Sequence, residues 1–244
     1  MLATGPADDR GRPGSAAWWA AHADRLARRR PRAGGLTIER LTVEAVAVID
    51  EGGLEALTVR RLAACFETSS ATLYRHVASV EELRVLVVDH VLGEIVLPES
   101  WQEPRSRVVA LSNELRRVLR EHPQVVPALR AAPLLGPNAM RAAESGLGNL
   151  LDMGLAPGVA VPAFLALIDF VLGSVFFDTP TGAHRLVDAR REAGAGVEAA
   201  PGGRAPGGSP FVEHASELET ASSDDVFSFG VERFLDGLEL TRGR

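Results

Sequence analysis

The sequence predicts an all-α protein in which a small three-helix helix-turn-helix domain is followed by a larger helical domain. Three observations support this fold class. Apolar residues recur at helical spacing along most of the chain, Ser and Thr stand before several of these segments as N-caps, and Pro or Gly separates them. From these patterns we divide the chain into a flexible basic N-terminal extension (1–35), the helix-turn-helix domain (36–78) and the larger helical domain (79–244).

The N-terminal extension has the composition of a tail. Its first fifteen residues are rich in Gly, Pro, Asp and Arg, which is typical of disorder. Residues 16–30 can form a helix that carries Trp18, Trp19, His22 and Leu26, and an arginine-rich stretch follows it. Two interpretations stay open, because the segment is either a solvated basic tail or an arm that contacts DNA phosphates or the minor groove.

Three helices are predicted between residues 37 and 77. Thr37 caps the first, and Gly52-Gly53 ends it. Thr58 caps the second, whose apolar residues form one inward-facing stripe at i, i+3, i+4 and i+7: Val59, Leu62, Ala63 and Phe66. Ser69 caps the third, residues 70–76, which Leu73 and Val77 anchor. A turn this tight places the third helix in a DNA major groove.

The outward face of this unit carries short hydrogen-bond donors and cations, the side chains that contact base edges and phosphates. An alternative remains open for each of two residues. Tyr74 could instead pack in the core with a free hydroxyl, and Arg75 could instead be a solvated surface charge. The residues predicted to bind DNA are Arg60, Ser69, Ser70, Thr72, Tyr74, Arg75 and His76.

The larger domain begins with a helix that Ser79 and Glu82 start as a capping box. A long amphipathic helix follows over residues 105–121, and residues 124–153 form two or three shorter helices. Residues 179–210 are rich in Gly, Ala, Pro and Arg and predict a mobile loop. After a short helix near 211–219, an amphipathic helix spans 224–240.

Residues 158–178 are apolar on nearly every side of one helix. Such a helix is buried on all sides, so we expect it to pack both on its own core and on a second subunit. Asp169 is the exception within it, and it either serves a pocket or meets an Arg at a subunit interface.

Residues 36–92 resemble the DNA-binding domain of the tetracycline-repressor (TetR) family, through the blocks LTVRRLA and ATLYRHV at a fixed separation. The chain after them resembles the C-terminal domain of that family more loosely. The turn position that the family gives to Gly is Glu67 here, and the usual Lys after the recognition helix is Val80. The resemblance implies phosphate contacts by Tyr74 and His76, and a homodimer held by helices 158–178 and 224–240.

The resemblance also implies a small-molecule effector in the larger domain. Tetracycline repressors hold a magnesium-chelated drug with two histidines, a polar contact and a carboxylate, of which only His122 is retained. A pocket this poor in oxygen ligands does not suit a hard cation, so we expect an apolar, metal-free effector. His122 either bonds it or caps its own helix. The predicted lining is Leu119, His122, Val126, Leu129, Met140, Leu147, Phe164 and Ile168.

Other classes of protein fit the sequence less well. A net charge of −6 argues against non-specific coating of nucleic acid. We find no run of about 20 apolar residues and no signal-peptide pattern, and therefore expect a cytoplasmic protein with no membrane partner. No catalytic motif, metal site or cofactor-binding motif is recognisable. The expected function is a regulator, most readily a repressor, released from double-stranded operator DNA by the effector; the alternative is an α-helical enzyme or adaptor without DNA binding.

Overall fold

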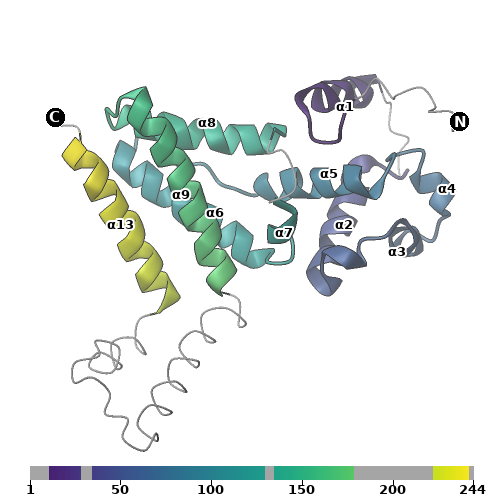
Figure 1. The fold of residues 1–244 in the computed structure, drawn as a ribbon. Coiled ribbons are helices and arrows are strands. Elements are labelled where there is room, and N and C mark those ends of the chain that lie inside the picture. Colours follow the sequence, from purple (N-terminus) through teal and green to yellow (C-terminus); the bar gives the residue numbers. More distant parts are fainter. Residues whose placement is uncertain (1–10, 29–34, 130–134, 179–221, 242–244) are drawn as a thin grey trace, which may run out of the picture. The chain divides into compact units, whose positions relative to one another are not determined.

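The computed structural model describes residues 11–28, 35–129, 135–178 and 222–241, and over these residues every regular element is a helix (Figure 1). This confirms the all-α class. The predicted loop at 179–210 and the short helix at 211–219 lie outside the described residues. The helices are α1 (Ala16–Arg28), α2 (Ile38–Gly52), the 3-10 helix η1 (Leu54–Ala56), α3 (Val59–Cys65), α4 (Ser70–Leu73), α5 (Val80–Leu92), α6 (Pro104–Glu121), α7 (Val126–Leu129), α8 (Pro137–Asp152), α9 (Pro157–Asp178) and α13 (Ser223–Thr241).

The chain forms two compact units. The first unit groups Met1–Glu99 with Arg117–Gly148, and the second groups Ser100–Arg116 with Asn149–Arg244. Helices α6 and α8 therefore contribute residues to both units. The boundary expected after Ala78 concerns where DNA binding ends, which compactness does not test, so it stays a prediction.

Four predicted N-caps start the helices around the helix-turn-helix. Thr37 and Thr58 accept hydrogen bonds from the amides three residues on, at the starts of α2 and α3. Ser69 does the same for α4, and Ser79 for α5. The capping box of α5 differs in one detail, because the Glu82 carboxylate accepts from the amide of Ala78, at 2.6 Å, instead of that of Ser79. Helix starts in this region are therefore determined locally.

The core of the first unit is aliphatic, with fully buried leucine and isoleucine side chains from α2, α3, α4 and α5: Leu41, Ile49, Leu62, Leu73 and Leu83. Phe66, expected on the inward stripe, is only half-buried. It follows the last residue of α3 as the C-cap, so the helical spacing no longer directs it inward. The guanidinium of Arg40 lies over its ring, 5.8 Å from the centroid.

Helix α1 is a docked part of the first unit, which differs from the flexible extension that we expected. Trp18 and His22 are buried, and the two rings stack with centroids 5.0 Å apart. Arg25 donates to the carboxylate of Glu82 at 2.8 Å, and the Glu82 side chain is almost fully buried. A buried carboxylate without a partner is costly, so this ion pair holds α1 against α5.

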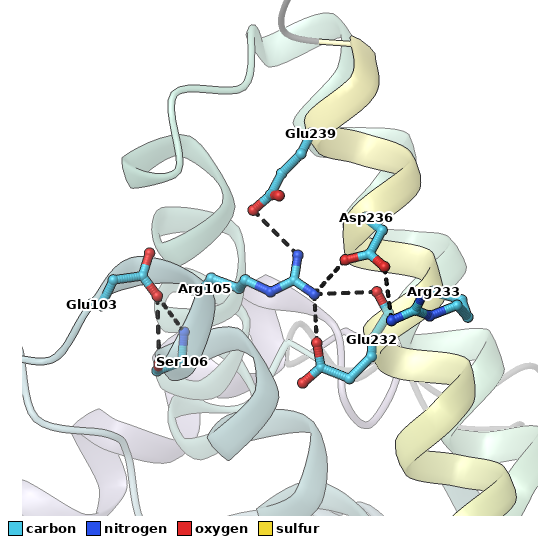
Figure 2. A network of polar contacts seen from close by, with 7 residues as sticks. All are labelled: Glu103, Arg105, Ser106, Glu232, Arg233, Asp236 and Glu239. Atoms are coloured by element: carbon cyan, nitrogen blue, oxygen red, sulfur yellow. Dashed lines mark hydrogen bonds and ion pairs between the residues drawn. The ribbon is translucent and has the colours of Figure 1, made fainter.

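In the second unit α13 packs on α9, burying Val171 and Val175 of α9 with Phe227, Val231 and Leu235 of α13. Phe170 stacks on Phe227 at 5.5 Å. At the start of α6, Arg105 contacts three carboxylates of α13, those of Glu232, Asp236 and Glu239 (Figure 2). Helix α13 is thus held by apolar packing on α9 and by the charge of Arg105 at the start of α6.

The expectation that the chain has no apolar run of about 20 residues is wrong for helix α9. Its residues Pro157–Phe176 are long and apolar enough to cross a membrane by length and composition. Only 28% of that window is buried within the chain. The buried positions Ala160, Ala163, Leu167, Val171 and Val175 follow helical spacing and form one stripe. The opposite stripe is exposed and also apolar except for Asp169, which is exposed on it, and this explains why nearly the whole helix is apolar.

Candidate DNA-binding surface and effector site

The turn between α3 and α4 is tight and contains a strained residue. Glu67, at the position where the family has Gly, has a φ of 48°, in the left-handed region. The amide of Thr68 bonds the carbonyl of Ala63 at 3.0 Å, which closes the end of α3. The turn therefore keeps α4 close to α3 at the cost of roughly 1–2 kcal/mol of backbone strain.

Helix α4 is shorter than the predicted 70–76, because it ends at Leu73 and residues 74–76 form a turn. The amides of Arg75 and His76 bond the carbonyls three residues before them, at 3.2 and 2.8 Å. Such i to i−3 bonds tighten a helix end. Leu73 and Val77 are still buried as predicted, so the face that points outward is unchanged.

The predicted DNA-binding residues lie on the outside of this unit. Tyr74 is 55% exposed, which excludes the alternative that it packs in the core. A chain of side-chain bonds links three others: Ser69 and Thr72 hydroxyls lie 3.0 Å apart, and Arg75 donates to Thr72 at 3.2 Å. Ser70 is also exposed, and His76 is half-buried. These residues form one polar surface, which we call the α3–α4 surface.

The two arginines at the start of α3 differ in their contacts. Arg61 is bound by Glu51 of α2, whereas Arg60 is exposed and has no ion pair among the described residues. The charge of Arg61 is thus partly neutralised within the protein. Arg60 is the cation of α3 that stays available for an external anion.

The predicted effector-binding residues are divided between the two units. Leu119, Val126 and Leu129 belong to the first unit and are buried, while Met140 is 39% exposed. Leu147 of the same unit is half-buried, as are Phe164 and Ile168 of the second unit. The six apolar residues other than Met140 are therefore at least half-buried, and their common pocket stays a prediction.

His122 bonds two carboxylates. Its Nδ1 lies 2.7 Å from Asp50 of α2, and its Nε2 lies 3.2 Å from Glu94, just after α5. Burial lowers the pKa of His122, but the hydrogen bonds and charges of Asp50 and Glu94 outweigh it and raise the pKa above its ordinary value. Only a protonated imidazole donates from both nitrogens, so the geometry favours the charged form. The ring therefore does not cap its own helix, as one interpretation had it.

Comparison with known proteins identifies the family of this chain. Residues 97–242 match the family described as Tetracyclin repressor-like, C-terminal domain. The transcriptional repressor DrrR1 of Streptomyces coeruleorubidus is 31% identical over 87% of this chain and 82% of its own length. A transcriptional regulator of Saccharopolyspora erythraea is 34% identical, over 57% of this chain and 60% of its own length.

The chain belongs to the tetracycline-repressor family.

Solved structures of the tetracycline-repressor family have the same fold. The TetR family protein ActR of Streptomyces coelicolor, in complex with actinorhodin, superposes with a TM-score of 0.73 at 29% identity, covering 86% of this chain and 100% of that one. This protein is accordingly a ligand-responsive, DNA-binding transcriptional regulator of the tetracycline-repressor family, with a helix-turn-helix before a larger helical domain.

Some contacts of this tetracycline-repressor family member could not be found from the sequence. Arg25 and Glu82 are 57 residues apart, and His122 and Asp50 are 72 residues apart. Arg116 is a further case, because it lies 2.5 Å from Asp224 and over the ring of Phe227, at 4.6 Å. The only available signal was a charged residue at an inward-facing helical position, which Glu82 and Arg116 both are.

Proposed function

We propose that this regulator is a homodimeric repressor that binds a near-palindromic operator and leaves it when a small apolar molecule binds the larger domain. The observation that carries the proposal is the α3–α4 surface, where exposed donors and cations are held on a helix-turn-helix by a buried leucine core. In such a motif the second helix enters the major groove and the first supports it.

The individual contacts follow from side-chain chemistry. Arg60 and Arg75 suit guanine O6 and N7, and Ser70 and Thr72 can bond either base edges or phosphates. The Tyr74 hydroxyl, on an exposed ring, is suited to a phosphate, as is His76. Because a recognition surface of this size reads only a few base pairs, two copies on half-sites about 34–36 Å apart, or a multiple of that spacing, would supply tight binding.

The exposed apolar stripe of α9 and α13 supports the homodimer. Val161, Leu165 and Phe176 of α9, with Val226 and Phe229 of α13, are each at least 45% exposed. Large apolar side chains gathered on neighbouring helices mark a protein contact surface. A second copy presents the same stripe, so a two-fold interface buries both at once. This arrangement also supports a cytoplasmic location for α9, since the partner subunit replaces a lipid environment.

The effector is proposed to be apolar and free of metal. Within the described residues there is no group of three or more His, Cys, Asp or Glu side chains that could hold a metal ion. Both nitrogens of His122 are engaged by Asp50 and Glu94, so an effector that bonds His122 must replace one of these carboxylates. Release of DNA then requires that the effector bind the non-binding conformation more tightly.

A gel shift with the DNA upstream of the gene that encodes this chain tests the proposal. Retardation by the unmodified protein, abolished by the double variant Arg60→Ala/Arg75→Ala with an unchanged helical circular dichroism spectrum, is the expected result. No retardation of any upstream fragment at micromolar protein would contradict it and favour an adaptor or an α-helical enzyme. Addition of magnesium and tetracycline should leave the shift unchanged, whereas a chelator-sensitive release would contradict the metal-free effector site.

A further inference from the structure

A pocket lies in the first unit, beside helix α1. It has a volume of about 480 Å³, and residues of α1, α2, α5 and the start of α8 line it. This volume is within the range of small-molecule sites, roughly 300–1,000 Å³. None of the eight predicted effector-binding residues is among its described lining residues, so it is a separate site.

One wall of the pocket is aromatic. Trp19 is held edge-on by two neighbours, with ring centroids 4.8 Å from Trp18 and 5.7 Å from His22. Ile38 and Leu86 add aliphatic surface from α2 and α5. Because Trp18 and His22 are themselves buried, the Trp19 ring is fixed before any ligand arrives. A fixed indole beside aliphatic side chains suits a flat aromatic molecule.

Few polar groups of the pocket can bond a ligand. The indole Nε1 of Trp19 is buried, so a molecule in the pocket contacts the ring and not this donor. His90 lines the same pocket and is half-buried. The pocket therefore offers a ligand mainly aromatic and aliphatic surface.

The charges around the pocket exclude an anion. Glu39 and Asp89 line it, and no Arg is among the described lining residues. Asp89 accepts from the amides of Asn138 and Ala139 at 3.1 and 3.0 Å, and from the Asn138 side chain at 3.1 Å. Burial raises the pKa of Asp89 against the effect of these bonds. Because its oxygens accept hydrogen bonds at the start of α8, Asp89 forms part of the pocket wall and does not hydrogen-bond a ligand.

We propose that this pocket is a second ligand site, which takes a flat aromatic molecule without negative charge. Such a ligand contacts α1, α2, α5 and the start of α8 together, and it therefore stabilises the docked position of α1. Binding of this ligand is independent of DNA release, and it can be measured on the protein without DNA.

The test uses acridone, a flat neutral probe with one carbonyl and one N–H, and the full-length protein without DNA. Calorimetric titration is expected to show micromolar binding accompanied by quenching of tryptophan fluorescence. Acridone-10-acetate, which adds a carboxylate, should bind at least about tenfold more weakly because Glu39 and Asp89 repel it. No binding of acridone, or equal binding of the two probes, would overturn the proposal.

Two variants on α1 locate the binding. Ala23→Phe places a ring in the pocket that Ala23 lines and should weaken acridone at least about tenfold by overfilling it. Ala20→Phe is the matched control, because Ala20 is exposed on the same helix and is not a lining residue; it should leave binding unchanged. Binding that survives Ala23→Phe but is lost in Phe164→Ala would assign the probe to the effector site and overturn the inference.

Discussion

The α3–α4 surface and the exposed stripe of α9 and α13 are both uncovered, but they expose opposite chemistry. The first presents hydroxyls, a phenol and guanidinium groups, such as those of Ser70, Tyr74 and Arg60. The second presents large apolar side chains, among them Leu165 and Phe229. Polar groups that hydrogen-bond water lose little by staying exposed, whereas an apolar stripe gains free energy when it is covered. The first surface is therefore stable in water in the absence of DNA, whereas the second is stabilised when a partner covers it.

The largest expected effect comes from charging the apolar stripe. Leu165→Arg, at a position 56% exposed, should convert the dimer to a monomer, because it places a charge within the apolar surface that the second copy covers. Loss of the second half-site should weaken operator binding by on the order of 10²–10⁴-fold. Sedimentation and gel shift measure the two effects.

The control for this variant is Leu151→Arg on α8, which is exposed but does not belong to the stripe, and it should remain dimeric. Val171→Arg on the same helix does not serve as a test of the dimer, since Val171 is 1% exposed and packs inside its own chain. A monomeric wild-type protein at micromolar concentration would contradict the assignment of the stripe.

The next effect concerns the polar surface. Arg60→Ala should weaken operator binding by roughly 1–3 kcal/mol, the worth of a bidentate guanine contact, and relax the preference at one base pair. Arg117→Ala removes an arginine that pairs with Glu121 on α6, and should change affinity little. Fluorescence anisotropy with operator and mutated operator measures both. If Arg60→Ala stays within twofold of wild type, Arg60 does not read a base.

His122 makes the first unit sensitive to pH. Because the pKa of His122 is raised above 6.5 in the folded protein, its bonds to Asp50 and Glu94 contribute stability that is complete below the unfolded pKa and is lost as pH rises through the folded one. His122→Gln should therefore cost about 1 kcal/mol of unfolding free energy at pH 6 and less at pH 9. Denaturant titrations of both proteins at the two pH values measure this, and a cost that grows with pH would contradict it.

The smallest effect concerns the turn that supports the polar surface. Glu67→Gly should raise the free energy of unfolding by about 1 kcal/mol, because glycine adopts the positive φ of this position without strain. Operator affinity should stay the same, since the backbone conformation is kept. Glu55→Gly, at an exposed residue of η1 without a positive φ, is the comparison and should not stabilise. Thermal unfolding decides between them.

Local features of the helix-turn-helix were predictable from the sequence. The caps Thr37, Thr58, Ser69 and Ser79 act on amides three residues away, so the pattern that predicts them lies within one turn of helix. The left-handed conformation of Glu67 is found at the turn position that the family gives to Gly. The predicted length of α4 was wrong, because the residue types do not indicate that i to i−3 hydrogen bonds replace the helix after Leu73.

The residue pattern is sufficient to predict the all-α class, the starts of the helices and the outward polar face of α4, since each depends on neighbours within about four residues along the chain. Only the tertiary structure decided that α1 docks through Arg25 and Glu82, that His122 bonds Asp50 and Glu94, and that one stripe of α9 is buried while the other is exposed. These features join residues that are tens of positions apart. A residue pattern records which side chains are apolar or charged, but the partner that each one meets is set by how the helices pack.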